Sequence, residues 1–523
     1  MKRNLFLLLA TLLLGSATAQ VHIPTRDEVG AAAACPETIA PIEAPFYMPP
    51  MERPTFPDYT VRVACPTNGD MATRAIQKAI DQTAKRGGGR VIVPAGHWHT
   101  GRITLKSNVD LHLEEGCELH FSGEIEDYLP AVFTTNEGVE ITSLGACIYA
   151  CNEENIALTG KGRLIGPKSG SIKDRQVSFA VEKIDINTPV EKRIYDGRNG
   201  GEVFLPTFFG PINCKKVFLE GVRFEQGFFW NIAPVYCEEL IIRGVEVESV
   251  GIPRGEGVDI TCCKYVLIEY STMACGDDNF AMKGGRNEYG EAIGKASENI
   301  VMRHCLTLRG HGGITCGSET AGWIRNLYTH DCVFDGTQVG IRFKTRRPRA
   351  GGGENLIYER IRMRTTKGAI VWDMLGNPAW IGELAARKPA QRWTKLTPAF
   401  RGITIRDVVV EGCRELIDMK AIPESPVRHL QIENLTLDMR AAKGEQSDPR
   451  NQRLMLLRDV EGMSMRGFTM MGAEKPLIEV VDGRNLLFEN WKTEGITPEV
   501  RYEGDLTGDI RFYNSPGWEQ FAK

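Results

Sequence analysis

The chain has 523 residues and a formal net charge of −4, with 42% hydrophobic and 25% charged residues. These values are ordinary for a protein that buries a large core, and they give no reason to expect nucleic acid or a membrane surface as a partner. A chain of this length forms either one large repetitive domain or about three ordinary domains.

The N-terminus has the pattern of an export signal. A basic start precedes an apolar run from Leu5 to Leu14, and a small-residue A-x-A site ends at Ala19. The run is too short to span a bilayer, and no later segment is long and apolar enough to do so. We therefore expect residues 1–19 to be a cleaved signal peptide and the mature protein to be periplasmic or extracellular, without a membrane span.

The next segments predict an arm and a cap. Residues 20–58 are proline-rich and aperiodic, which favours an extended arm along the surface. In "ATRAIQKAIDQTAKRGGG" the apolar side chains recur on one helical face and three glycines end the helix. A repetitive fold needs such a cap over its first unit, because its end otherwise exposes core and strand edges. The residues expected on that face are Ala72, Ile76, Ala79, Ile80 and Thr83.

Metal ligation is not expected. His97 and His99 stand two residues apart and could face a metal ion from one strand, but a surface pair beside a turn explains them as well. Neither Cys147 with Cys151 nor Cys262 with Cys263 has a second pair at structural-zinc spacing. The fourteen cysteines are scattered through apolar runs, which favours buried free thiols. Whether one or two pairs form disulfides stays open, and no connectivity can be deduced.

From residue 216 onward one short pattern returns, with apolar residues at its first, third and sixth places and a polar pair between them. The intervals between copies are 23 to 47 residues, and weaker copies begin near residues 108 and 155. Alternation followed by a polar bend predicts two short strands per copy. Copies begin at Val217, Leu240, Val266, Ile300, Leu327, Leu356, Ile403, Leu430, Met463 and Leu486.

Repeats of this length without helical periodicity are typical of a parallel β-solenoid, in which stacked coils share one core. The longer intervals predict loops inserted on the outside. The largest, "GNPAWIGELAARKPAQRWTKLTPAF", has the composition of a wall beside a cleft. We therefore expect an all-β chain in which residues 59–523 form a single domain.

Unusual polar residues recur at coil-like intervals. Asp277 and Asp278 follow Glu256 by 21 and 22 residues, and His311 follows Asp277 by 34. Arg342 and Lys344 follow His311 by 31 and 33 residues. In stacked coils such residues occupy neighbouring rungs about 4.7–4.9 Å apart. Each has a simpler explanation alone, as a turn, a solvated edge or a basic surface, but their coincidence suits acid and base carboxylates acting on a glycosidic bond.

The same residues resemble the motifs of glycoside hydrolase family 28, the polygalacturonases and rhamnogalacturonan hydrolases. That family has N-T-D-G, G-D-D, G-H-G and R-I-K, and this chain has "RGEG", "GDD", "GHG" and "RFK" in the same order. The likeness covers most of residues 60–440 and is closest to the exo-acting bacterial members. It implies a right-handed parallel β-helix that hydrolyses α-1,4-galacturonosidic bonds of pectin with inversion, as a monomer without cofactor.

The resemblance also implies roles for individual residues. Asp277 matches the general acid, Asp278 and Glu256 match the pair that activates water, and His311 matches the histidine that tunes the acid. The residues expected to bind the substrate carboxylates are Arg342, Lys344, Lys283 and Arg254.

One motif departs from the family, because Arg254-Gly255-Glu256 stands where the family has N-T-D. The departure keeps three alternatives open: action on rhamnogalacturonan or another uronate-containing glycan, a calcium-dependent β-helical pectate lyase, and a glycan-binding solenoid without catalysis. Products from defined pectic oligosaccharides would separate these alternatives.

Overall fold

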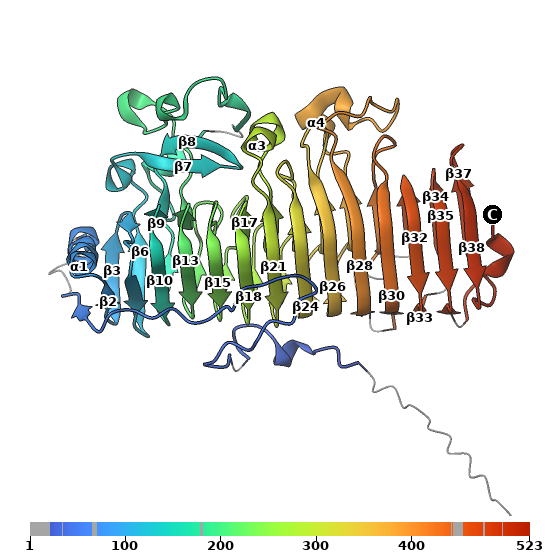
Figure 1. The fold of residues 1–523 in the computed structure, drawn as a ribbon, viewed down its shortest axis with the longest axis horizontal. Coiled ribbons are helices and arrows are strands. Elements are labelled where there is room, and N and C mark those ends of the chain that lie inside the picture. The colour runs from blue at the N-terminus through green and yellow to red at the C-terminus, as the bar shows by residue number, and fades with distance from the viewer. Residues whose placement is uncertain are drawn as a thin grey trace, which may run out of the picture.

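Each copy of the repeat folds into strands that lie parallel to those of the copies before and after it (Figure 1). The computed structural model describes residues 21–33, 35–64, 71–177, 181–440, 442, 453–473, 476–493 and 495–523. The predicted signal peptide, residues 1–19, lies outside these ranges. No helix within the described ranges is long and apolar enough to cross a lipid bilayer.

The longest ladder of parallel strands runs from one end of the stack to the other. Its members in order are β1 (Thr60–Arg62), β2 (Gly89–Val93), β5 (Val109–Leu113), β10 (Glu154–Gly160), β13 (Lys215–Glu220), β15 (Glu238–Arg243), β18 (Lys264–Glu269), β21 (Ser297–Arg303), β24 (Ile324–Asp335), β26 (Gly352–Arg364), β28 (Ala399–Val410), β30 (Val427–Asp438), β32 (Val460–Arg466), β35 (Arg484–Glu489) and β38 (Gly508–Tyr513).

The predicted repeats are in register along this ladder. The first apolar residues of successive copies are direct partners, from Val217 and Leu240 through to Met463 and Leu486. All of them are at most 2% exposed and belong to one continuous core. The repeat therefore marks the inward-facing positions, as predicted for a parallel β-helix.

A second ladder follows the polar bend of each copy. Its strands are β3 (Gly96–Thr100), β6 (Cys117–Phe121), β11 (Arg163–Ile165), β14 (Arg223–Glu225), β16 (Glu246–Glu248), β19 (Thr272–Ala274), β22 (Leu306–Arg309), β33 (Thr469–Met471) and β36 (Lys492–Thr493). From β24 to β30 the two strands of a copy merge into one long strand. The bend persists there, because residues such as Asp331, Asp407 and Asn434 have φ between 52° and 55°.

A third ladder closes the coil and carries most of the predicted site residues. It begins with β4 (Ile103–Thr104), β9 (Ala146–Cys151) and β12 (Thr207–Ile212). Single bridges through Ile232 lead on to the next strands. These are β17 (Val258–Thr261), β20 (Phe280–Lys283), β23 (Gly312–Cys316), β25 (Val339–Lys344), β27 (Gly368–Asp373), β29 (Glu415–Lys420), β31 (Arg453–Arg458), β34 (Leu477–Val481) and β37 (Glu499–Glu503).

The predicted capping helix is present at the first coil (Figure 1). Helix α1 (Thr73–Lys85) buries Ile76, Ala79, Ile80 and Thr83 over the first coil, and Ala72 precedes it. The N-terminal arm runs along the outside of the stack, where its apolar side chains pack on outward-facing residues of the long ladder such as Phe218 and Tyr328.

Inserted segments stand together along one edge of the solenoid (Figure 1). They are the antiparallel hairpin of β7 (Val132–Asn136) and β8 (Val139–Ser143), and the short helices α2 (Ser171–Asp174), α3 (Asn287–Ile293) and α4 (Pro378–Ile381). Helix α4 lies in the largest predicted insertion, and Lys395 of that insertion pairs with Glu291 of α3 at 2.6 Å. The thirteen cysteines in the described part of the chain are free, as expected for buried thiols, and Cys65 lies outside it.

Candidate active site

The predicted catalytic residues lie where successive strands of the third ladder begin. Glu256 precedes β17, Asp277 and Asp278 precede β20, and His311 directly precedes β23. Backbone hydrogen bonds join these segments: Gly257 N donates to Asp278 O at 3.0 Å, and His311 N donates to Asp277 O at 2.9 Å. The coil spacing thus places all four residues on three adjacent rungs.

Asp277 and His311 form the part of the cluster that solvent reaches most easily. Their side chains are 17% and 41% exposed, and His311 Nδ1 lies 2.8 Å from Asp277 Oδ1. The same oxygen accepts a hydrogen bond from the Asp278 backbone N–H at 2.9 Å. Asp277 is therefore held in one orientation at the surface of the site, within reach of a bound ligand.

Asp278 lies deeper, and two cations from β25 hold it. Its side chain is fully buried, Arg342 Nη1 donates to its Oδ1 at 3.0 Å, and Lys344 Nζ lies 3.6 Å from its Oδ2. Burial by itself would raise the pKa of Asp278, but Arg342, Lys344 and Lys283 outweigh it and hold the pKa well below its usual range. Asp278 is therefore a carboxylate that stays ionised.

Lys283 is buried among the carboxyl groups of the site. Its side chain is 4% exposed, and its Nζ lies 3.3 Å from Glu319, 3.4 Å from Asp259 and 4.0 Å from Glu256. The ammonium also sits over the Trp230 ring at 4.5 Å. The side chain neutralises these buried carboxylates, and its contact with substrate stays a prediction.

Glu256 and Asp259 share the ammonium group of Lys283. Burial, followed by the charges of Asp277 and Asp259, raises the pKa of Glu256 well above its usual range. Burial also raises the pKa of Asp259 to about 8, although Lys283 opposes this. The site therefore combines one ionised carboxylate with neighbours that favour holding a proton. Such a difference in pKa between nearby carboxyl groups is typical of acid and base pairs.

Arg254 links the site to the β7–β8 hairpin. Its Nη1 lies 3.2 Å from Glu137 Oε1 in the hairpin turn, and its guanidinium stacks over Phe229 at 4.9 Å. Arg286 holds the other oxygen of Glu137 at 2.7 Å. Arg254 is 27% exposed and can still reach a ligand, but its position depends on the hairpin.

Three buried or half-buried acids of this network escaped the sequence analysis. Asp259 follows Glu256 by three residues. Its charge inside the apolar strand "GVDI" could have indicated a functional residue. Glu319 was signalled only by its position eight residues after His311. Nothing local marks Glu137, which comes from an inserted hairpin 117 residues before Arg254.

Comparison with known proteins agrees with the geometry. Residues 197–379, which contain every predicted catalytic residue, match the model of "Glycosyl hydrolases family 28". The part of the chain that carries the site is thus similar to the family 28 glycoside hydrolases. The chain is 26% identical over 404 residues to "Probable polygalacturonase" of Vitis vinifera, covering 75% of this chain and 74% of the relative. It is 24% identical to "Exo-poly-alpha-D-galacturonosidase" of Dickeya chrysanthemi, covering 69% of this chain and 63% of the relative.

A solved structure extends the similarity to the fold. The hyperthermoactive exopolygalacturonase of Thermotoga maritima superimposes with a TM-score of 0.67 at 26% identity, covering 85% of this chain and 94% of that one. The predicted right-handed parallel β-helix is thereby confirmed.

Proposed function

We propose that this protein hydrolyses α-1,4-galacturonosidic bonds of pectin from chain ends, with inversion of configuration. The observation that carries the proposal is the division of the cluster into an ionised, cation-held Asp278 and a more exposed Asp277 beside His311. Inverting hydrolysis requires one carboxyl group that gives a proton to the leaving oxygen and another that takes one from water.

Asp278 is the base in this scheme. The cations from β25 keep it ionised, so it can accept a proton from water under acidic conditions. Its Oδ2 and Glu256 Oε2 are buried oxygens that accept no hydrogen bond from the described residues. Each can therefore accept one from an attacking water; Glu256, whose pKa is raised, orients the water rather than taking its proton.

Asp277 is the acid. It is the most exposed of the three carboxyl groups, and it must reach the leaving oxygen of the scissile bond. Its side chain is 17% exposed, whereas those of Glu256 and Asp278 are 7% and 0% exposed. The contact with His311 Nδ1 fixes the direction of its Oδ1 and is the basis for a positioning role of the histidine.

The substrate carboxylate is bound by the cations of β25. The side chains of Arg342 and Lys344 are 20% and 25% exposed, although Asp278 pairs with both. Both cations can therefore still be reached from solvent, where a galacturonate carboxylate can pair with them. Action at chain ends is supported by the exo-acting relatives and by the hairpin that Glu137 ties to Arg254 next to the site.

We further propose that residues 59–523 form one catalytic domain, that residues 20–58 are its arm, and that the protein is exported as a monomer. The continuous core from α1 to β38 supports the single domain.

The proposal is tested by incubating defined oligogalacturonides and rhamnogalacturonan oligosaccharides with the protein and identifying the products by mass spectrometry. Release of galacturonate units from the ends of oligogalacturonides agrees with it. Cleavage of the rhamnogalacturonan fragments alone would instead assign the Arg254 and Glu256 site to that substrate. Binding without turnover would indicate a non-catalytic solenoid.

A further inference from the structure

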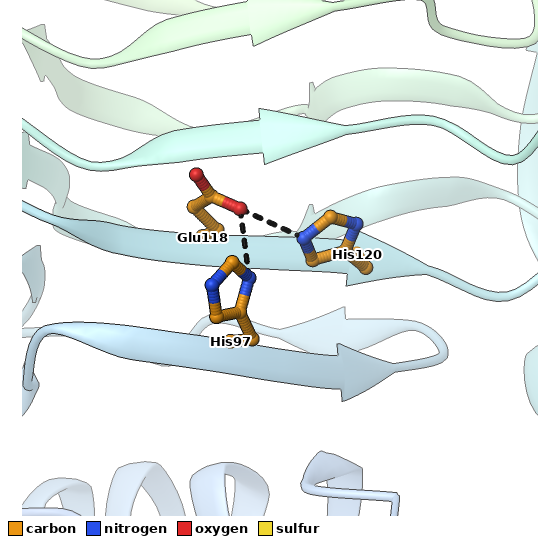
Figure 2. A group of neighbouring side chains, drawn as sticks. All are labelled: His97, Glu118 and His120. Atoms are coloured by element: carbon orange, nitrogen blue, oxygen red, sulfur yellow. Dashed lines mark hydrogen bonds and ion pairs between the residues drawn. The ribbon is translucent and has the colours of Figure 1, made fainter. Parts of the chain in front are cut away.

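Three potential metal ligands converge on the outer face of the first coils, in the second ladder and away from the active-site ladder (Figure 2). His97 lies on β3, and Glu118 and His120 lie on the neighbouring strand β6. His97 Nδ1 is 2.9 Å from Glu118 Oε2, and His120 Nε2 is 3.0 Å from the same oxygen. One ligand atom from each residue lies within 4.8 Å of the others.

We propose that His97, Glu118 and His120 form a binding site for a divalent transition metal ion, with zinc as the biological occupant. Two imidazole nitrogens and one carboxylate oxygen are a donor set that zinc takes in sites with one open position. Calcium and magnesium prefer sites made of oxygen alone, so this donor set selects against them.

The strand geometry explains why these side chains meet. Alternate residues of a strand face the same side of the sheet, so Glu118 and His120 both point outward from β6, while Trp98 and Leu119 between the ligands point into the core. The register pairs His97 with Glu118 and His99 with His120. On its own strand His97 has only His99 beside it, and for this reason no metal was expected; the other two ligands, Glu118 and His120, come from the next coil.

The distances suit an ion after a small movement. In tetrahedral zinc sites with bonds of about 2.0–2.1 Å, ligand atoms lie about 3.3 Å apart. The 2.9 and 3.0 Å contacts must therefore open slightly to admit the ion. His97 is 75% exposed and His120 is 32% exposed, so neither ring is locked by packing.

A neighbouring arginine fixes the carboxylate. Arg163 Nη1 on β11 donates to Glu118 Oε1 at 2.5 Å, which leaves Oε2 to face the histidines. Arg163 is itself held by Glu225 through two hydrogen bonds of 3.0 and 2.7 Å. Such outer partners orient metal ligands, and their loss typically lowers metal affinity about 10–100-fold.

The site would join two coils next to the α1 cap. β3 and β6 are the first two strands of the second ladder, so an ion bridging them fastens the end of the solenoid at which unfolding of stacked repeats can begin. Because an ion bound to the folded state stabilises it by mass action, zinc should raise the thermal unfolding midpoint. The ligands stand on a different ladder from Asp277, so hydrolysis should not depend on the ion.

The test is a calorimetric titration of zinc into the untagged protein after treatment with EDTA and desalting. The wild type is expected to bind one zinc ion per chain. His97→Gln and His120→Gln are expected to lose this binding, and Arg163→Gln to weaken it about 10–100-fold. His429→Gln is the matched control, because it removes an exposed histidine from the distant strand β30. Hydrolytic activity of each variant reports that it is folded.

A copper titration read by electron paramagnetic resonance identifies the donors. A signal with two imidazole nitrogens is expected in the wild type and is expected to be lost in His97→Gln and His120→Gln. The proposal is overturned if the wild type binds no zinc stoichiometrically, or if His97→Gln and His120→Gln bind it as the wild type does.

Discussion

Arg342→Gln should move the acidic limb of the pH–rate profile upward. Arg342 donates a 3.0 Å hydrogen bond to Oδ1 of the buried Asp278 and contributes to the lowered pKa of that carboxyl group. Removing the cation raises the pKa of Asp278. Since the base works only when ionised, activity is then lost at a higher pH as the solution is acidified.

The size of the shift follows from the interaction. A hydrogen bond to a charged group is worth about 1.5–3 kcal/mol. At 1.36 kcal/mol per pKa unit, its loss corresponds to a rise of about one to two units in the pKa of Asp278. Lys344 at 3.6 Å and the nearby Lys283 remain, so the pKa should not rise as far as burial alone would take it.

The assay is kcat/KM for an oligogalacturonide between pH 1.5 and pH 6, a range that includes the acidic limb of a carboxyl group with a strongly lowered pKa and reports the free enzyme. Arg325→Gln is the charge-matched control, because Arg325 pairs with Glu354 on the long ladder, away from Asp278. We expect an acidic limb displaced only in Arg342→Gln. A lower kcat/KM with an unmoved limb would mean that Arg342 serves substrate binding alone and that Asp278 is not the base.

Three further predictions concern individual groups. Glu256→Gln should reduce kcat less than Asp278→Asn, for which a loss of about 10²–10⁴-fold is expected of a missing base; an equal or larger loss in Glu256→Gln would move the base to residue 256. Lys283→Met should lower the free energy of unfolding by about 3–5 kcal/mol at pH 8.5, since it leaves buried carboxylates unpaired. The loss should be smaller at pH 5, because the raised pKa of Asp259, about 8, means that this group is protonated there and loses its proton only as pH rises through 8. Chemical denaturation at both pH values, with Lys264→Met as the exposed control, measures this, and a pH-independent loss would contradict it. Lys344→Ala should weaken activity on polygalacturonate more than on its methyl ester, measured as the ratio of kcat/KM values; equal losses would exclude a role in reading the carboxylate.

The fold was predictable because a short pattern of apolar residues determines each coil and is repeated along the chain. Apolar residues at fixed places in each copy, such as Val217, Leu240 and Val266, meet one above another in the core. The cap was predictable for the same reason, since Ile76 and Ile80 mark one face of α1. The merging of the two strands of a copy into one long strand, from β24 to β30, was not predictable. The bend residues of these copies, such as Asp331, look like the bend residues of the other copies.

The site was predictable only in part. Its motif residues fall on adjacent rungs and are brought together by the repeat itself. The positions of Lys283 and Arg254 depend on partners outside the repeat: Glu319 reaches Lys283 from a loop, and Glu137 reaches Arg254 from an inserted hairpin. The depth of Lys283 below the surface follows from packing on Trp230, which the spacing of motifs does not encode.

The central claim, that Asp277 and Asp278 work as acid and base on opposite sides of the bond, is tested most directly by the configuration of the first product. Proton NMR of an oligogalacturonide digest, recorded before mutarotation, measures it. An inverting site with a water between the carboxyl groups releases the β anomer from an α bond. Initial release of the α anomer would mean that a carboxylate attacks the sugar directly, and would contradict the account.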